Sequence, residues 1–315
     1  MEMYIAALDI GGTKTIAAIL DGDGKVIVKE QFPSFIASCE KHLDVCTQAL
    51  SRLLQQMSIT ADDLEGLGIS LPGIVDREKG MLIYAPYANW KNVAVAEYFK
   101  EKLGIEKICC ENDVNACAIG ENRFGLGKQY TDFVWMTVST GVGGAVVADS
   151  KLLRGGHGFA GEFGHLKVEY ENPAYCPCGQ SGCLEAHGSG TALIRKTRKR
   201  KLESEIFAKV LEERNLPADG AGCAELAKGG NQEAQEIMDQ IGMYLGRGIS
   251  YCLNILDPQA VVIGGGVAES LALLLPAIDR EIRKNTFRRM QDVDIVKTPL
   301  GYEAALSGAA ALILE

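Results

Sequence analysis

The chain has 315 residues, of which 47% are hydrophobic and 23% are charged, and its formal net charge is -9. This length predicts about two domains of roughly 150 residues each, and the composition excludes a wholly disordered chain. The acidic balance disfavours nucleic acid or an anionic membrane surface as a partner. No apolar run is long enough for a transmembrane helix, and the start lacks the basic segment of a secretory signal. We therefore expect a cytoplasmic protein whose cysteine thiols stay reduced.

Hydrophobic patterning and glycine turns predict the elements of the first part of the chain. Short apolar or alternating segments predict strands at 4–10, 14–20 and 25–32. Apolar residues at helical spacing predict a helix over 39–57, in which His42 is expected at the surface or its boundary. The elements expected next are, in chain order, a strand at 66–71, a helix at 92–103 and a strand at 107–113. Asp113 directly precedes an apolar helical stretch, so it is a candidate N-cap.

Strands and helices continue to alternate in the remainder of the chain. Its expected elements are, in chain order, strands at 132–140 and 144–149, a loop-rich region at 155–190, helices at 191–213 and 233–256, a strand at 260–267, and helices at 269–284 and 304–314. A strand, a glycine turn and a second strand at 4–20 are echoed at 132–149. This repeat predicts a duplicated α/β architecture with a cleft between two halves and a boundary near 115–118.

Three glycine-rich turns follow apolar strands. They begin at Asp9 (DIGGTKT), at Ser139 (STGVGG) and at Ile263 (IGGGV). Glycine lets backbone N–H groups approach an anion, threonine hydroxyls add donors, and Asp9 could hold Mg²⁺ directly or through water. None of the turns is a Walker A or GxGxxG sequence, and any one of them alone is more often a tight hairpin. Together they favour phosphate and nucleotide binding.

Three of the ten cysteines, Cys176, Cys178 and Cys183, are clustered. In a reducing compartment this spacing indicates a metal rather than disulfides, and Zn²⁺ takes four sulfur or nitrogen ligands in a tetrahedron. His165 is the nearest plausible fourth ligand, and His187 is its competitor. The alternative is three free thiols in a loop.

These motifs together resemble a known family. DIGGTKT, STGVGG and the IGGG turn are similar to the two phosphate loops and the adenosine loop of the actin–hexokinase–chaperone ATPase fold. GHGFAGEFGH followed by CPCGQSGCLEA resembles the signature of the ROK family of sugar kinases and repressors, and the resemblance runs from Asp9 to Gly308-Ala309-Ala310. It implies an α/β, two-domain actin-like ATPase (ribonuclease H-like) fold with a central cleft and duplicated βββαβαβα-type domains. The small domain would comprise 1–117, with a helix at 300–315 packing back on it, and the larger domain, 118–299, would carry the zinc loop.

The resemblance also implies the acceptor site. Asp113 matches the general base and Asn112 its neighbour that hydrogen-bonds sugar hydroxyls. The other residues implied to contact the sugar are Gly73, Asn89, Glu162, His165 and Glu185. His165 is also implied to complete a structural Cys₃His zinc site with Cys176, Cys178 and Cys183, so that one ring nitrogen would bind zinc and the other the sugar. The roles of His157, at a turn or at the sugar, and of His187, at the sugar or in the zinc shell, stay open.

The nucleotide is implied to bind residues of all three turns, namely Asp9, Gly11, Gly12, Thr13, Lys14, Thr140, Gly141, Gly143, Gly264 and Gly265. We expect ATP, Mg²⁺, a structural Zn²⁺ and a hexose as ligands, with no nucleic acid or membrane partner. Relatives of this kind are often homo-oligomers, so a dimer or tetramer is expected.

The implied activity is ATP-dependent phosphorylation of a hexose hydroxyl, with the 6-OH of glucose as the expected acceptor. N-acetylmannosamine, N-acetylglucosamine, allose or fructose need similar hydroxyl-binding residues, and an N-acetylmannosamine kinase is the second candidate. A sugar-responsive transcriptional repressor is disfavoured, because only eight residues precede Asp9 and leave no room for a helix-turn-helix segment. A catalytically inactive sugar-binding protein is disfavoured by Asp113 and the intact turns. The basic run at 195–201 is expected to be a solvated helix face.

Overall fold

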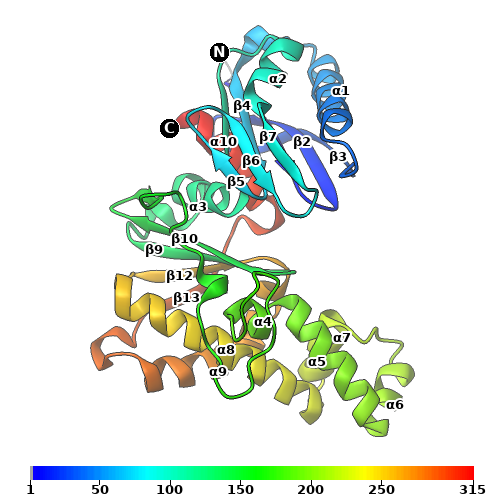
Figure 1. Cartoon of the computed structure of the whole chain (residues 1–315), viewed down its shortest axis with the longest axis vertical. Coiled ribbons are helices and arrows are strands. Elements are labelled where there is room, and N and C mark those ends of the chain that lie inside the picture. Colours follow the sequence, from blue (N-terminus) through cyan, green and yellow to red (C-terminus); the bar gives the residue numbers. More distant parts are fainter. Residues whose placement is uncertain (1–2) are drawn as a thin grey trace. The chain divides into compact units, whose positions relative to one another are not determined.

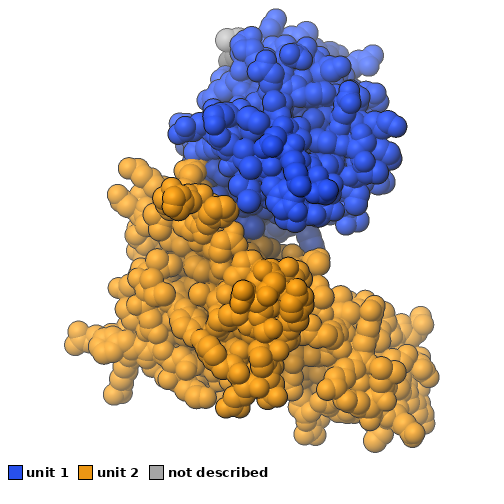
Figure 2. Space-filling view, in the orientation of Figure 1, with its two compact units in different colours: residues 1–129, 299–315 blue, residues 130–298 orange. Residues whose placement is uncertain are grey.

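The computed structural model describes residues 3–315, which form two compact units (Figure 2). The first unit extends to Gln129 and includes the closing segment Pro299–Glu315, and the second unit is Tyr130–Thr298. The expected boundary at residues 117 and 118 falls within helix α3 (Asp113–Phe124), which belongs as a whole to the first unit.

A mixed five-stranded sheet organises the first unit. Its strands are β1 (Tyr4–Ile10), β2 (Lys14–Asp21), β3 (Val26–Pro33), β4 (Leu64–Leu71) and β8 (Ile108–Asn112), in the order β3-β2-β1-β4-β8. The first three strands are antiparallel neighbours, whereas β4 runs parallel to both β1 and β8. The carboxyl ends of β1, β4 and β8 therefore meet at one edge of the sheet.

Helices cover both faces of this sheet, as the alternation of side chains along β1 requires. Leu8 and Ile10 pack with residues of α1 (Cys39–Met57) and α2 (Val95–Leu103), and Ile5 and Ala7 pack with α10 (Ala304–Leu314) on the other face. Figure 1 shows α10, in red, beside α3 and the sheet. The unit also contains a small antiparallel sheet formed by β5 (Ile74–Asp76), β6 (Met81–Ala85) and β7 (Trp90–Val93).

Glycines allow α10 to approach its neighbours closely. A Cβ atom on Gly68 of β4 would collide with the Ala309 carbonyl oxygen, and one on Gly308 would collide with the Ala116 carbonyl oxygen of α3. Part of the high glycine content is thus explained by backbone packing in the core rather than by ligand binding.

The second unit repeats the sheet of the first. Its strands β9 (Phe133–Val138), β10 (Val142–Ala148), β11 (Lys151–Leu153), β12 (Ala260–Gly264) and β13 (Asp294–Lys297) lie in the order β11-β10-β9-β12-β13. As in the first unit, three consecutive strands are antiparallel and the two later strands join in parallel. The duplicated architecture inferred from the two glycine hairpins is therefore present in the topology.

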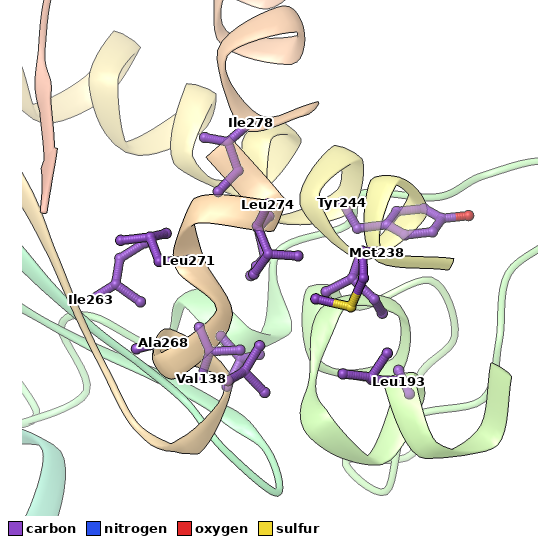
Figure 3. Packing of buried hydrophobic residues seen from close by; sticks show 14 of the residues in the cluster. Val138, Leu193, Met238, Tyr244, Ile263, Ala268, Leu271, Leu274 and Ile278 are labelled. Atoms are coloured by element: carbon purple, nitrogen blue, oxygen red, sulfur yellow. The ribbon is translucent and has the colours of Figure 1, made fainter. Parts of the chain in front are cut away.

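Helices bury one face of the second sheet in a large apolar core. They are α4 (Leu184–Gly188), α5 (Gly190–Glu203), α6 (Glu205–Glu213), α7 (Gly220–Lys228), α8 (Gln232–Leu256) and α9 (Leu271–Asn285). Figure 3 shows Leu271, Leu274 and Ile278 of α9 within this core, together with Val138 of β9 and Ile263 of β12. Short 3-10 turns complete the chain at Ala61–Asp63, Leu126–Lys128, Phe163–His165, Gly266–Ser270, Arg288–Met290 and Gly301–Glu303.

The structure corrects three expectations from the sequence. The helix expected over 191–213 is broken at Ser204, which ends α5 and caps α6 by accepting a hydrogen bond from the Phe207 N–H. His42 is fully buried rather than at the surface, since it shares the apolar face of α1 with Leu43 and Cys46. Strands β5–β7, β11 and β13 and helices α4 and α7 were not predicted. Among residues 3–315, no helix combines the length and apolarity needed to cross a membrane.

Candidate functional site

Asp9 and Asp113 lie at the carboxyl edge of the first sheet. Asp9, the last residue but one of β1, lies opposite Ser70 of β4, whose hydroxyl donates a 3.2 Å hydrogen bond to the Asp9 carboxylate. Asp113 directly follows β8 and begins α3. Burial raises the pKa of Asp9, although Ser70 and Lys14 lower it, and burial together with the charge of Asp9 raises the pKa of Asp113 to about 7. A carboxyl with a pKa near neutrality is suited to taking a proton from a hydroxyl.

Asn112, rather than Asp113, is the N-cap of α3. Its side-chain oxygen accepts hydrogen bonds from the N–H groups of Val114 (3.0 Å) and Asn115 (3.2 Å), and its Nδ2 donates to the Gly73 carbonyl oxygen (3.0 Å). Asp113 is therefore the first helical residue, because the amide of Asn112 reaches the unpaired N–H groups of the first turn. The amide also connects β8 to the turn after β4, so the structure gives Asn112 a structural role beside the sugar-binding role expected for it.

Gly73 and Asn89 have unusual backbone conformations. Gly73 has a φ of 137°, and a Cβ atom there would collide with the Tyr84 carbonyl oxygen, so another residue would not fit. Asn89 has a φ of 52° and is exposed. Glu111, the first residue of the Glu-Asn-Asp motif, is buried and accepts hydrogen bonds from the backbone of Asn112 and the side chain of Asn115. Glu111 thus stabilises the connection from β8 to α3.

The first glycine turn connects β1 to β2. The Gly11 N–H donates to the Lys14 carbonyl oxygen at 3.0 Å, and a Cβ atom on Gly12 would lie 3.2 Å from the Tyr87 ring. Gly12, Thr13 and Lys14 are exposed. The turn is therefore a tight hairpin whose tip is accessible, which is compatible with binding an anion.

The second and third glycine turns lie at the carboxyl edge of the second sheet. Gly264 ends β12 beside Thr137 of β9. Gly265 has a φ of 87°, and a Cβ atom there would lie 2.5 Å from the Val138 carbonyl oxygen. The start of α5 is hydrogen-bonded to the second glycine turn, since the Thr191 hydroxyl donates to the Thr140 carbonyl oxygen at 2.7 Å. The predicted turn residues Thr140, Gly141, Gly143, Gly264 and Gly265 thus belong to one edge of this unit.

The clustered cysteines are brought together with one histidine. The ligand atoms of His165, Cys176, Cys178 and Cys183 all lie within 4.8 Å of one another. Three sulfurs and one imidazole nitrogen at these separations fit the tetrahedral site that Zn²⁺ prefers. The histidine is His165, whose Nδ1 lies 3.9 Å from the Cys176 sulfur.

His187 takes a different position. It is buried, its Nε2 accepts a 2.9 Å hydrogen bond from the Ala174 N–H, and its ring lies 4.6 Å from that of Tyr244. Through this hydrogen bond it supports the loop between β11 and α4. It is not one of the four grouped ligands. His157 is exposed in the same loop.

Glu162, His165 and Glu185 lie around the cysteine cluster. The Nε2 of His165 is 3.8 Å from the Glu162 carboxylate, so the two ring nitrogens face different groups. One carboxylate oxygen of Glu185 accepts a 3.1 Å hydrogen bond from the Val142 N–H, and the other lies 3.9 Å from the Cys176 sulfur. Glu185 therefore connects the cysteine loop to the second glycine turn. Several polar groups with distinct orientations suit a polyol ligand.

Comparisons with known proteins identify the family. The family model described as the ROK family matches residues 5–315. The chain belongs to the ROK family. This ROK protein is 30% identical to a glucokinase of Thermotoga maritima, over 100% of its own length and 98% of the relative's. It has the α/β, duplicated actin-like ATPase fold that the sequence predicted.

Two solved structures illustrate the range of the family. A ROK family glucokinase from Streptomyces griseus, in complex with glucose and AMPPNP, is 29% identical, with 98% of each chain covered and a TM-score of 0.83. A ROK family transcriptional regulator, described as a homologue of the E. coli MLC protein, is 26% identical with a TM-score of 0.86. The match covers 99% of this ROK protein and 77% of the regulator. The fold alone therefore does not separate kinases from regulators.

Sequence reasoning missed the groups that support the first glycine turn. Ser34, which follows β3, donates a 2.6 Å hydrogen bond to the Gly11 carbonyl oxygen. The Ser34 hydroxyl is also hydrogen-bonded to Thr15, which is in turn hydrogen-bonded to His42. No motif marks these residues, although the apolar neighbours of His42 at helical spacing are a signal for its burial.

Proposed function

We propose that this ROK protein is an ATP-dependent hexose kinase that phosphorylates the 6-OH of glucose. The main support is the carboxyl group of Asp113, which follows β8, is affected by the charge of Asp9 and has a pKa of about 7. The glucokinase relatives, one of them bound to glucose and an ATP analogue, support the same class of reaction.

In the proposed step, Asp113 accepts the proton of the sugar hydroxyl. The hydroxyl oxygen forms a bond to the γ-phosphorus of ATP as the bond from that phosphorus to the β–γ bridging oxygen breaks. The products are the sugar phosphate and ADP, and the proton resides on Asp113 until solvent removes it. Phosphoryl transfer needs mainly alignment and charge stabilisation from the protein, so a single positioned base is sufficient.

The first glycine turn and Asp9 are proposed to bind the phosphates and Mg²⁺. Mg²⁺ prefers oxygen ligands and keeps several waters, so the Asp9 carboxylate would hold it directly or through water. The exposed tip formed by Gly12, Thr13 and Lys14 offers backbone N–H groups, a hydroxyl and an ammonium to phosphate oxygens. Thr140, Gly141, Gly143, Gly264 and Gly265 are proposed to contribute the remaining nucleotide contacts.

The second unit is proposed to supply hydroxyl ligands for the sugar from Glu162, His165 and Glu185. His165, Cys176, Cys178 and Cys183 would hold Zn²⁺, which would fix the loop and orient the His165 ring. Gly73, Asn89 and Asn112 of the first unit are proposed as further sugar contacts.

An N-acetylhexosamine kinase, in particular one acting on N-acetylmannosamine, is the alternative within the same chemistry. The polar groups around the cysteine cluster recognise hydroxyls, which hexoses and N-acetylhexosamines share. The sugar therefore has to be found by assay.

The decisive experiment is a kinase assay with Mg·ATP across a panel of hexoses and N-acetylhexosamines. ADP release with glucose, abolished in Asp113→Asn and kept in the exposed control Asp62→Asn, is the expected result. A preference for N-acetylmannosamine would replace glucose as the substrate. No turnover on any sugar, together with specific binding of an operator DNA, would overturn the proposal in favour of a regulator.

A further inference from the structure

A chain of hydrogen bonds connects the buried face of α1 to the first glycine turn. His42 Nε2 lies 3.0 Å from the Thr15 hydroxyl, which lies 2.9 Å from the Ser34 hydroxyl. The Ser34 hydroxyl lies 2.6 Å from the Gly11 carbonyl oxygen. We call these groups the His42–Gly11 chain. His42 and Thr15 are fully buried, and Ser34 is half-buried.

The direction of every hydrogen bond in the His42–Gly11 chain follows from its two ends. The Phe35 N–H donates to His42 Nδ1 at 3.1 Å, so the imidazole proton resides on Nε2 and is donated to Thr15. At the other end, the Gly11 carbonyl oxygen can only accept, so Ser34 donates to it. Because this uses the only proton of the Ser34 hydroxyl, Thr15 must donate to Ser34.

This arrangement requires a neutral His42. A proton on Nδ1 would face the Phe35 N–H, and two donors would then oppose each other. Burial lowers the pKa of His42, which favours the same neutral form. Trp90 covers the imidazole, with ring centroids 5.6 Å apart, and its own N–H donates to the Ile36 carbonyl oxygen. The histidine is therefore fixed in both tautomer and position.

The His42–Gly11 chain determines how the peptide between Gly11 and Gly12 is oriented. In a trans peptide the C=O and N–H bonds point in opposite directions, and none of the described peptides is cis. With the Gly11 carbonyl oxygen held toward Ser34, the Gly12 N–H points away from it. Gly12 is exposed at the tip of the turn, so its N–H is available to an anion. A second bond, from the Ser34 N–H to the Thr13 carbonyl oxygen at 2.9 Å, fixes the other side of the turn.

We infer that His42, Thr15 and Ser34 are positioning residues that hold the Gly12 N–H in the orientation that binds a nucleotide phosphate. The inference rests on the proposed function, because it assumes that the first glycine turn binds Mg·ATP. The three residues act through Gly11 and Gly12.

The test measures Mg·ADP binding by calorimetry and the KM values for ATP and sugar. Ser34→Ala removes the donor to Gly11, and Thr15→Val removes two hydrogen bonds while keeping the side-chain volume. We expect each variant to weaken Mg·ADP binding and raise the KM for ATP by roughly tenfold, the usual effect of losing a buried hydrogen bond. The KM for sugar should change less than about twofold on the same reasoning. Thr15→Ser keeps the hydroxyl and should restore binding.

The controls are two hydroxyl residues on α1 that lie outside the His42–Gly11 chain. Thr47 donates to the Leu43 carbonyl oxygen and Ser51 to the Thr47 carbonyl oxygen, both at 2.9 Å. Thr47→Val and Ser51→Ala are matched to the two test variants and should bind Mg·ADP like the wild type. Hydrogen exchange of the free protein should show faster exchange over residues 9–15 in Ser34→Ala.

The outcomes separate the two proposals. If the wild type binds Mg·ADP and both Ser34→Ala and Thr15→Val bind it equally well, the positioning role is wrong and the kinase proposal stands. An equal rise of both KM values, with no rescue by Thr15→Ser, would indicate general destabilisation and would also overturn it. If the wild type does not bind Mg·ADP, the proposed function fails, and the positioning role fails with it.

Discussion

The negative charge of Asp9 contributes to the raised pKa of Asp113, about 7, although the two residues are far apart in the sequence. Parallel pairing of β1 with β4 and of β4 with β8 brings their carboxyl ends to one edge. Neutralising Asp9, by a proton or a bound cation, should therefore lower the pKa of Asp113.

The first prediction concerns turnover in Asp113→Asn. The amide cannot accept the hydroxyl proton, so kcat should fall by about 10²- to 10⁴-fold while sugar binding, measured by calorimetry, is retained. In the wild type, kcat/KM for the sugar should rise with pH through the pKa of Asp113 in the free protein, because only the carboxylate form acts as a base. A kcat within a few-fold of wild type in Asp113→Asn would remove Asp113 from the base role.

The second prediction concerns stability and uses the same substitution. The pKa of Asp113 is raised from 3.8 to about 7 in the folded protein, so the folded state holds this proton more tightly than the unfolded chain. The stabilisation of the folded state that results is fully present below pH 3.8 and is lost as pH rises through about 7. Asp113→Asn has no charge to bury, so above pH 7 it should be more stable than wild type, by up to about 4 kcal/mol for a shift of about three pKa units. Thermal unfolding of the free protein between pH 4 and 8 measures the difference, which should shrink toward acid pH. Asp62→Asn, at an exposed position, should show no such trend.

Much of the fold could be predicted from the sequence, because apolar periodicity and glycine turns are local signals. The helices at 39–57 and 304–314 have the expected bounds, and the hairpin repeat corresponds to two sheets of the same order. Strands such as β5 and β11 were missed because they have only three residues, too few for a periodic pattern.

The candidate site was only partly predictable for a related reason. Motif spacing identified the cysteines, and the structure places His165 rather than His187 with them. The cap of α3 was assigned to the wrong neighbour, because Asn112 and Asp113 are both good caps and only the backbone decides which one is helical. The His42–Gly11 chain depends on contacts between residues up to 27 apart, which no local pattern reveals.

The third prediction concerns zinc. Cys178→Ser removes one of the four grouped ligands, so zinc per chain, measured by elemental analysis of protein purified without chelators, should fall from about one to near zero. Sugar affinity should fall with it, because Glu162 lies in the cysteine loop and Glu185 lies in α4 directly after it. Cys39→Ser, a half-buried cysteine of α1, is the matched control and should keep its zinc. His187→Phe should also keep zinc, since His187 bonds Ala174 instead, and loss of zinc in that variant would contradict the assigned ligand set.

The fourth prediction tests the packing of α10 on the first sheet. Gly68→Ala places a methyl group against the Ala309 carbonyl oxygen, and backbone on both sides leaves no room for it to move. The free energy of unfolding should fall by about 1–3 kcal/mol, as expected for overpacking. Gly156→Ala is the control, because a Cβ atom there has open space around it. Equal stability of both variants in denaturant titrations would mean that α10 is not held as closely as the structure describes.

The last prediction concerns the connection between the second glycine turn and the cysteine loop. A Cβ atom on Gly141 would collide with the Glu185 carboxylate oxygen that accepts the Val142 N–H. Because a carboxylate at the end of a side chain can move, Gly141→Ala should fold but displace Glu185 from its position. If Glu185 binds the sugar, kcat/KM for sugar should fall by about 10- to 100-fold, the usual effect of losing a charged hydrogen bond. Glu185→Ala should have a similar effect, and the double variant should be no worse than the more damaging single variant, because both changes remove the same interaction. Fully additive losses would show that Gly141 acts on turnover by another route, for instance through the nucleotide, and that the two sites are independent.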